Sequence, residues 1–424
     1  MGSLLIPALK SSPTISNVEV QILCYCARSL LDEAAKKELK AILQHRIDWR
    51  SLLQMANMHG MMPLLYKTLS NTCPEAVPVP VLTKLKTFFN LNGLRNQALA
   101  QELLRLLDLL ASNGIPAIPF KGPVLAIASY GSLSLRQFSD LDILVRPQDF
   151  VRARDLLLSN RYQRSQPIHG IADVETEELA LMQARGEYSL RHQNGQYLID
   201  LHDRLIAGEF PLLSADFKVF WQRLSPISIL NKEVSSFCVE DLLLYLCIHG
   251  SKDLWKKLSW VCDIATLIHT HPQLNWEQVI ARSQSLESEQ MLWLGISLAR
   301  DILETPLPDV ASKRMETHFR KQTFSNQIQA QLTSGILPTA IVYSNLQRVF
   351  FHGQLVENKA DRLRHYLKFV DNLLFHRFRP NINDKAFVVL PHGFYFLYYL
   401  VRPFRLAAKF AGRLTQRLTK AKAP

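Results

Sequence analysis

Two aspartates, Asp140 and Asp142, stand at the start of an apolar run, Ile143-Leu144-Val145. Residues two apart in a strand point to the same face, so we expect both carboxylates to project together while Leu141 faces the core. Two anions at that separation repel each other unless a proton or a cation lies between them. Oxygen ligands without a nearby Cys or His pair favour Mg²⁺ or Mn²⁺ over zinc. The spacing indicates a divalent-cation site, and the alternative is a strand start with two solvated acids.

The residues before the acids predict a strand, a turn and a helix. Residues 115–120 (I-P-A-I-P-F) are typical of a short buried strand, although two prolines make it a poor central one. Lys121-Gly122-Pro123 breaks this strand, and the helix predicted at 124–130 ends at Gly131. A glycine beside a helix N-terminus lets backbone N–H groups approach a phosphate, and Lys121 adds a positive charge. A phosphate turn, a short helix and paired acids together indicate a nucleotide and metal site.

A hairpin follows later in the chain. Residues 187–192 and 197–202 alternate apolar and polar side chains around Asn194-Gly195, the strongest short-range hairpin signal, because both turn residues need positive φ. On the second strand Asp200 and His202 share a face. A strand adjacent to the first acidic strand could bring Asp200 beside the acid pair.

Two alternatives stay open on this strand. His202 could assist the chemistry or simply bond a backbone carbonyl. Asp203 could be the acid if the register is shifted by one residue, but in the register given above it faces the core.

The stretch from 120 to 145 resembles the nucleotidyltransferase superfamily typified by DNA polymerase beta, and more narrowly the bacterial uncharacterised nucleotidyltransferase family. The resemblance covers roughly residues 40 to 300, and its specific part is D-L-D-I-L-V at 140–145. The other matching residues are Lys121-Gly122, Tyr130, Arg136, Asp200-Leu201-His202, His59-Gly60, His249-Gly250, Trp255, Trp260 and Asp263. One departure is Gly122-Pro123, where the superfamily usually has Gly-Ser or Gly-Gly. A literal Gly-Ser occurs at Gly131-Ser132, close to Asp140, so either glycine could form the phosphate turn, and we favour Gly122.

The resemblance implies a third carboxylate, Asp200, beside the acid pair. The predicted catalytic and metal-binding residues are therefore Asp140, Asp142 and Asp200, with His202 as an auxiliary residue. The predicted nucleotide-binding residues are Lys121, Gly122, Arg136 and Ser139. The implied reaction moves a nucleoside monophosphate from an NTP to an acceptor hydroxyl with Mg²⁺ or Mn²⁺ and releases pyrophosphate. The acceptor, whether sugar, peptide, protein or RNA, cannot be deduced from the sequence.

Other functions compete with this prediction. In glycosyltransferases and haloacid-dehalogenase-type phosphatases the paired acids come at the end of an apolar strand, whereas here the apolar run follows them. The main alternative is a catalytically weak or inactive nucleotide-binding or scaffold protein, recruited to a membrane or partner by its C-terminal helices. Pro123 keeps that alternative open.

Composition limits the broad class. The chain has 424 residues, 48% apolar and 20% charged, which is typical of a globular protein. Its six cysteines contain no C-x-x-C pair, so neither a zinc knuckle nor a thioredoxin-like motif is supported, and buried thiols in a reducing compartment are expected. The first ten residues are too short and proline-broken for a signal peptide, so we expect a cytoplasmic protein.

We expect an α+β fold with a small mixed sheet flanked by helical regions. The predicted strands lie near 115–120, 140–146, 187–192 and 197–203. The predicted regions are an N-terminal helical region at 1–113, a catalytic core at 114–235, a packed helical region at 236–305 and a C-terminal helical extension at 306–424.

The C-terminal extension carries most of the charge imbalance. The formal net charge is +12, and residues 402–424 hold seven Lys or Arg and no acid. The preceding residues, 387–404, are apolar and aromatic but interrupted by prolines, which argues against a clean spanning helix. Residues 387–424 therefore predict peripheral contact with the inner face of a membrane, and a partner groove, a packed helix with a solvated tail or a nucleic-acid arm are the alternatives.

Overall fold

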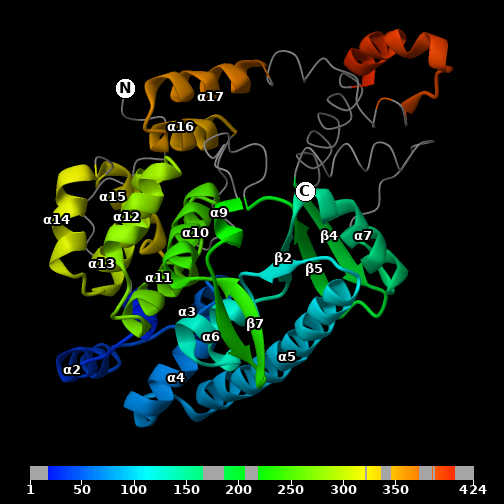
Figure 1. Cartoon of the computed structure of the whole chain (residues 1–424). Coiled ribbons are helices and arrows are strands. Elements are labelled where there is room, and N and C mark those ends of the chain that lie inside the picture. The colour runs from blue at the N-terminus through cyan, green and yellow to red at the C-terminus, as the bar shows by residue number, and fades with distance from the viewer. Residues whose placement is uncertain are drawn as a thin grey trace, which may run out of the picture.

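A mixed five-stranded sheet lies at the centre of the protein, with helices on both sides of it (Figure 1). The structure, a computed structural model, describes residues 18–165, 186–205, 218–319, 322–335, 345–371, 384 and 387–405. Strands and helices both contribute substantially, so the expected α+β class is confirmed.

The sheet has the strand order β1-β2-β5-β4-β3. Its strands are β1 Ala117–Pro119, β2 Leu141–Val145, β3 Tyr162–Arg164, β4 Glu187–His192 and β5 Leu198–His202. The four predicted strands are present, and β3 is an additional edge strand that the sequence analysis missed. At the opposite edge, β1 is short and, among the strands that the structure describes, pairs only with β2, as expected for a strand that contains proline.

Three of the four strand pairs are antiparallel, whereas β2 and β5 run parallel. The predicted hairpin is β4–β5, with Gly195 at positive φ in its turn. In the parallel pair, Leu141 lies opposite Ile199 and Asp142 lies opposite Asp200. A shift of one residue would turn every side chain of β5 to the other face, so this register decides which β5 residues meet β2.

The two faces of the sheet differ. Leu141, Ile143 and Val145 of β2 belong to a hydrophobic core that includes Ile199 and Leu201 of β5. This core is closed by leucines of α5 (Val79–Ser112) and by residues of α7 (Phe150–Ser159). The other face carries Asp142, Asp200 and His202 and is turned toward α10 (Val239–Lys252), where Tyr245 packs edge-on against Phe120.

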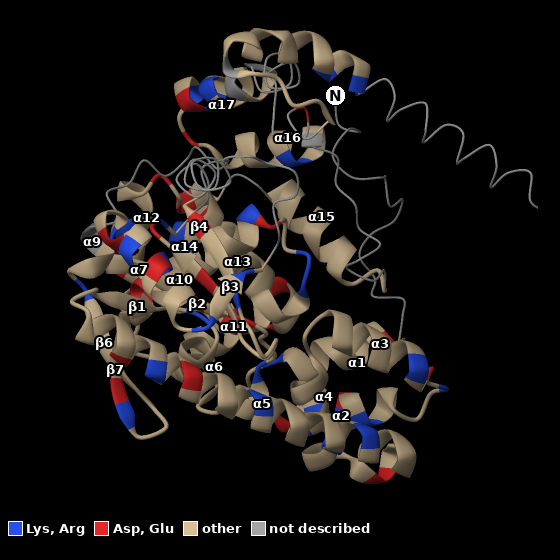
Figure 2. Ribbon diagram, turned by 90° about the vertical axis from the view of Figure 1, so that its right-hand side faces the viewer, with Lys and Arg blue, Asp and Glu red and all other residues tan. Residues whose placement is uncertain are grey.

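Helices precede the sheet in the sequence. They are α1 Val18–Ala27, α2 Glu33–Ile42, α3 Trp49–Met58, α4 Met62–Thr72, the 3₁₀ turn η1 Pro74–Ala76 and the 34-residue α5. Asp48 caps α3, because its carboxylate accepts from the backbone N–H of Ser51. Basic and acidic residues are interspersed over these helices (Figure 2).

Short helices connect the strands. They are α6 Pro123–Tyr130, η2 Leu133–Leu135, η3 Pro147–Asp149, α7 and α9 Lys218–Trp221. Helix α6 begins one residue before the expected position and ends at Gly131, whose left-handed conformation (φ 63°) caps it.

A two-stranded hairpin that was not predicted follows the main sheet. It pairs β6 Leu224–Ile229 with β7 Lys232–Phe237. Its turn residues, Leu230 and Asn231, both have positive φ, which Leu rarely adopts, and Pro226 stands within β6. These departures from usual strand and turn composition explain why the pattern was missed. The hydroxyl of Ser236 donates to the carbonyl of Pro119, 2.6 Å away, and so ties this hairpin to the sheet edge.

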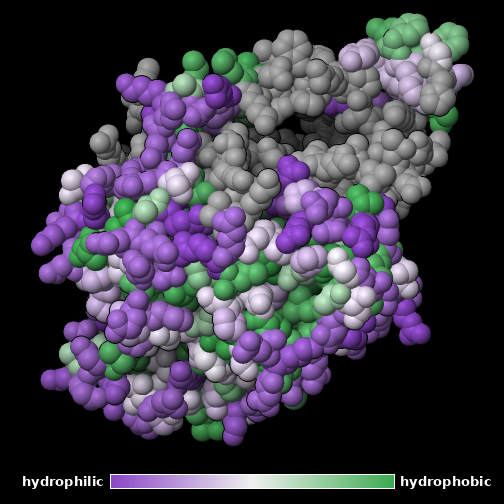
Figure 3. Space-filling view, in the orientation of Figure 1, coloured by the Kyte–Doolittle hydropathy of each residue, from purple (hydrophilic) through white to green (hydrophobic). Residues whose placement is uncertain are grey.

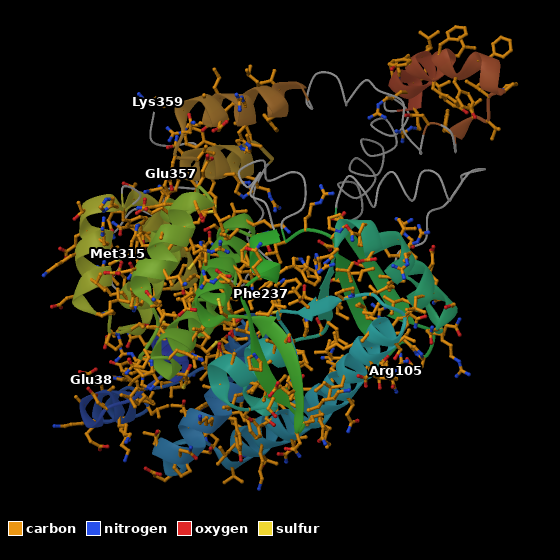
Figure 4. All side chains as sticks on the ribbon, in the orientation of Figure 1. Glu38, Arg105, Phe237, Met315, Glu357 and Lys359 are labelled. Carbon is orange, nitrogen blue, oxygen red and sulfur yellow. The ribbon has the colours of Figure 1, made fainter. Side chains whose placement is uncertain are left out.

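The helices after the hairpin share a core with the N-terminal helices. They are α10, α11 Leu258–Thr270, α12 Trp276–Ser285 and α13 Glu289–Leu303, and buried residues from all four join those of α1 to α4 in one hydrophobic cluster. Phe237, labelled in Figure 4, stacks on Phe120 and lies where this cluster meets the sheet. The division into four regions remains a prediction about folding units.

The two His-Gly pairs have structural roles at helix contacts. The ring of His59 accepts a hydrogen bond from the N–H of Leu258 at the start of α11. At Gly250, a Cβ atom would stand 2.5 Å from the ring of Trp255, so only glycine allows this close packing.

The described C-terminal helices are α14 Asp309–His318, α15 Gln322–Leu332, α16 Asn345–Leu355, α17 Lys359–Asp371 and η6 His392–Leu397. In Figure 1, α14 and α15 lie beside α12 and α13, whereas α16, α17 and the C-terminal segment drawn in red stand at the upper end of the protein. Within the described ranges, no helix is long and apolar enough to cross a membrane. The basic stretch after residue 405, which the predicted membrane contact includes, lies outside the described residues. All six cysteines carry free thiols, and five are buried.

Candidate functional site

The three predicted acids meet on one face of the sheet. Asp142 and Asp200 are direct partners across the parallel pair β2–β5. Asp140 precedes Asp142 by two residues, directly before β2 begins at Leu141, and its carboxyl group is close enough to Asp142 and Asp200 for their charges to interact. Their charges interact, since Asp140 and Asp142 each disfavour ionisation of Asp200.

Asp142 is the centre of this arrangement. Its Oδ1 atom lies 3.1 Å from Nζ of Lys121 and 3.2 Å from Nε2 of His202. Phe120 packs edge-on against the His202 ring, with 5.4 Å between centroids, and fixes its plane. In the structure the ring of His202 contacts the carboxylate of Asp142, an acid of the site. This contact favours the first of the two alternatives, in which His202 assists the chemistry.

The three carboxyl groups differ in pKa because their charged neighbours differ. Burial would raise the pKa of Asp142, but Lys121 and His202 hold it well below its ordinary value. Burial and the charge of Asp142 raise the pKa of Asp140. Burial, Asp142 and Asp140 raise the pKa of Asp200 to about 6, against the opposing hydrogen bond from Ser189. The site thus holds more negative charge than its own cations balance, which favours binding of a further cation.

Ser189 is a site residue that the sequence analysis missed. It lies opposite Asp200 in the β4–β5 hairpin, and its hydroxyl is 2.5 Å from Oδ1 of Asp200. The hydroxyl donates to this oxygen, which directs the carboxylate and leaves Oδ2 for another partner. The signal was present, because pairing the hairpin strands around Asn194-Gly195 sets residue 189 against residue 200.

Gly122 forms the turn between β1 and α6, directly beside the acids. Its backbone (φ 52°, ψ −120°) belongs to a region that only glycine adopts readily, and a Cβ atom there would stand 3.2 Å from the carbonyl of Asp140. Gly131 lies at the other end of α6, and its Ser132 hydroxyl accepts from the N–H of Ser134. Of the two candidate phosphate turns, Gly122 is the one in contact with the backbone of the acid pair.

Arg136 has a buried partner that the sequence did not reveal. Its Nε and Nη2 atoms donate to both carboxylate oxygens of Asp263 on α11 at 3.0–3.2 Å, and the hydroxyl of Tyr130 donates to the same carboxylate at 2.8 Å. Nη1 takes no part in this pair. Ser139, one residue before the acids, is exposed. Arg136 therefore anchors the segment that leads to Asp140 to the helical region.

The same segment is held from the other side by two asparagines of α5. The side-chain amide of Asn92 donates to the carbonyls of Ser134 and Arg136, and that of Asn96 donates to the carbonyls of Leu133 and Arg136. Both asparagines are buried, so these bonds satisfy backbone groups that water does not reach.

Two aromatic residues of α10 complete the surroundings of Lys121. Nζ of Lys121 lies 5.4 Å from the ring centroid of Tyr245, and His249 stacks on Tyr245 at 5.9 Å. Burial, together with the charges of Lys121 and Lys252, holds the pKa of His249 well below its usual range, so this ring is neutral. Burial would lower the pKa of Lys121, but Asp142 and Tyr245 hold it above its ordinary value, so the lysine is charged.

The donor set suits a hard divalent cation, since three carboxylates on one face offer only oxygen. Within the described residues, no three His, Cys, Asp or Glu side chains already surround a common point as metal ligands do. Burial and the charges of the neighbouring carboxylates raise the pKa of Asp140 and Asp200, and this unfavourable concentration of negative charge is the feature that fits a cation.

Comparisons with known proteins identify the family of this chain. Residues 45–304 match the family described as "Uncharacterised nucleotidyltransferase". This match covers more than half of the chain, and the protein belongs to that family. None of the curated proteins matches the chain. One similar solved structure is that of an antigenic nucleotidyltransferase-like protein from Paracoccidioides brasiliensis, with 16% identity over 51% of this chain and 95% of that chain and a TM-score of 0.30. At that TM-score the likeness supports no conclusion about this protein.

Proposed function

We propose that this protein moves a nucleoside monophosphate from an NTP to an acceptor hydroxyl and releases pyrophosphate. Membership of the nucleotidyltransferase family supports this reaction class. The observation that carries the proposal is the parallel register of β2 and β5, which sets Asp200 beside Asp142. We also propose, on the D-x-D pattern at the start of β2, that the family belongs to the superfamily typified by DNA polymerase beta.

The triphosphate would bind at the turn before α6. Lys121 is charged, nearly buried and next to the acids, so it can exchange Asp142 for a phosphate oxygen. Backbone N–H groups near Gly122 at the helix start add donors. Nη1 of Arg136, the nitrogen not used by Asp263, and the hydroxyl of the exposed Ser139 are the further proposed phosphate donors.

Asp200 would act as the general base. Burial and its acidic neighbours raise its pKa to about 6, which keeps it ionised but basic near neutral pH. The acceptor oxygen attacks the α-phosphorus, the bond to pyrophosphate breaks, and the hydroxyl proton passes to Oδ2 of Asp200. Ser189 holds Oδ1 of the same carboxylate and so orients it, while His202 keeps Asp142 in place.

Mg²⁺ or Mn²⁺ is the proposed cofactor, with Asp140, Asp142 and Asp200 as its ligands. Bound there, it would neutralise charge on the phosphate oxygens. The three carboxylates supply the oxygen-only ligand set that these ions require. The acceptor remains open.

The alternative is a nucleotide-binding protein that transfers nothing. The observation that favours it is that Oδ1 of Asp142 is already occupied by Lys121 and His202. In that case the Lys121–Asp142 ion pair would persist when a nucleotide binds, and Lys121 would not bind its phosphate.

The test is transfer of label from α-³²P-labelled NTPs, with Mg²⁺ or Mn²⁺, to a cell-extract acceptor pool, followed by mass spectrometry of the products. We expect labelled product and pyrophosphate from the wild type and a loss of at least about 10³-fold in Asp142→Asn and Asp200→Asn. Asp309→Asn, which changes an exposed aspartate at the start of α14, is the matched control and should leave transfer unchanged. A wild type that binds NTP but labels no acceptor with either ion would refute the transferase and leave the binding protein.

A further inference from the structure

The described C-terminal segment 387–405 exposes a dense set of apolar side chains. Of the 21 large hydrophobic side chains that are exposed among the described residues, nine belong to it. They are Phe387, Val388, Val389, Phe394, Tyr395, Phe396, Tyr399, Leu400 and Phe404. In Figure 4 the rings of this segment project outward, away from the body of the protein. Exposed apolar surface of this density marks an interaction site and not ordinary surface.

Helix α17 adds a second apolar strip. Leu363, Leu367 and Val370 are exposed and are spaced four and three residues apart, so they share one helix face. Both elements stand at the upper end of the protein, where Figure 3 shows hydrophobic surface over each of them. We call segment 387–405 and this strip of α17 the apolar end.

Charge in the sequence on the C-terminal side of the apolar end is of one sign. No acidic residue occurs after Asp384, which is fully buried and bonds both Arg402 and Arg405. One carboxylate balances only one of these two guanidinium charges, so the three groups together keep one positive charge, and the exposed side chains of the segment are mainly apolar. The 19 residues that follow, 406–424, contain Lys409, Arg413, Arg417, Lys420 and Lys422 and no acid.

We propose that the apolar end binds the surface of an anionic phospholipid bilayer. Phe, Leu and Tyr side chains suit the boundary between headgroups and acyl chains, and the five Lys or Arg that follow in the sequence with no acid among them suit anionic headgroups. Apolar side chains alone or cations alone do not give firm attachment to a membrane, whereas the two together do. A second copy of this chain fits less well, because association would bring two positive tails together. This inference does not depend on the proposed reaction, and it places the reaction at a membrane.

The test is co-sedimentation of the full chain with vesicles of phosphatidylcholine alone and with about 30% phosphatidylserine. We expect binding only to the anionic vesicles, weakened when salt rises from about 0.05 M to about 0.5 M. Phe396→Gln/Leu400→Gln/Phe404→Gln changes three side chains that are 65%, 62% and 74% exposed, so folding is retained. It should lower vesicle affinity at least about tenfold, as should Lys409→Gln/Arg413→Gln/Arg417→Gln.

The matched control is Leu91→Gln/Leu94→Gln on α5, whose side chains are 61% and 65% exposed but lie outside the apolar end. It should bind vesicles as the wild type does. Three outcomes would overturn the proposal. These are a wild type that does not sediment with anionic vesicles, full binding by the Phe396 triple variant, and light scattering in which that variant alone turns an oligomer into a monomer. The last outcome would assign the apolar end to a second copy.

Discussion

Nζ of Lys121 lies 3.1 Å from Oδ1 of Asp142, and both side chains are nearly buried. The pair joins the proposed phosphate turn to the central acid of the proposed metal set. One ammonium group thus balances the carboxylate in this structure and is also the group best placed for a triphosphate. Substitutions at these two positions separate the structural role from the binding role.

Lys121→Met should destabilise the fold, because it leaves Asp142 buried with only His202 as a partner. Breaking a buried ion pair by removing one member costs about 3–5 kcal/mol. Lys121→Met/Asp142→Asn removes both charges and should recover a large part of that loss. Urea unfolding of the two single variants and the double variant gives the coupling energy. Additive losses would mean that the two groups do not interact in solution.

Asp200 should make the protein less stable at neutral pH than at acid pH. Its pKa in the folded protein is raised from 3.8 to about 6, so the folded state holds its proton more tightly than the unfolded state. This contribution to stability is fully present below about pH 4 and is lost as the pH rises through about 6. Asp200→Asn should therefore raise the free energy of unfolding by about 1–3 kcal/mol at pH 7.5, since one pKa unit corresponds to about 1.4 kcal/mol.

The measurement is thermal unfolding of the metal-free protein at several pH values. The stabilisation by Asp200→Asn should shrink as the pH falls from about 7.5 to about 4.5. Adding Mg²⁺ should stabilise the wild type and have little effect on the variant. A variant that is less stable than the wild type at pH 7.5 would contradict the raised pKa.

Local patterns predicted much of this site. The strand and turn signals before Asp140 and the Asn194-Gly195 hairpin are set by neighbouring residues, and α6 and β5 lie within two residues of their expected positions. Ser189 follows from the same hairpin register. The parallel pairing of β2 with β5 does not, because alternation of side chains tells which face a residue takes but not which strand is its neighbour. That placement of Asp200 rested on the family resemblance.

The partners of Arg136 show a second limit. Asp263 is 127 residues away in the chain, and Asn92 and Asn96 are at least 40 residues from the carbonyl of Arg136. Each residue by itself looks like an ordinary helix residue, and only tertiary packing brings them together. The sequence analysis therefore assigned Arg136 to phosphate alone and missed that it anchors the segment leading to the acids.

Asp263→Asn should test that anchor. It removes the charge that both Nε and Nη2 of Arg136 bond, and it leaves a nearly buried guanidinium without a counter-ion. We expect a loss of about 3–5 kcal/mol in stability and a lower rate of transfer. Arg136→Met/Asp263→Leu should restore stability without restoring transfer, since an apolar pair of similar volume is tolerated at such sites. Urea unfolding and the labelled-NTP assay measure the two effects separately. Full transfer by the double variant would show that Arg136 contributes neither position nor charge.

Gly122→Ala should separate the two candidate phosphate turns. Gly122, Gly131 and Gly114 all have positive φ, but a Cβ atom meets the carbonyl of Asp140 only at Gly122 and meets nothing within 4 Å at the other two. Alanine at Gly131 or Gly114 should cost only the left-handed strain of about 1–2 kcal/mol and leave nucleotide affinity unchanged.

Alanine at Gly122 cannot keep its backbone and must move Asp140, so the affinity for a non-hydrolysable NTP analogue with Mg²⁺ should fall at least about tenfold. Isothermal titration calorimetry of the three variants gives the affinities, and circular dichroism confirms that each is folded. Loss of affinity in Gly131→Ala, with Gly122→Ala and Gly114→Ala unaffected, would move the phosphate site to Gly131-Ser132. The proposed geometry excludes that result, because Gly122 is the glycine that touches the backbone of the acid pair.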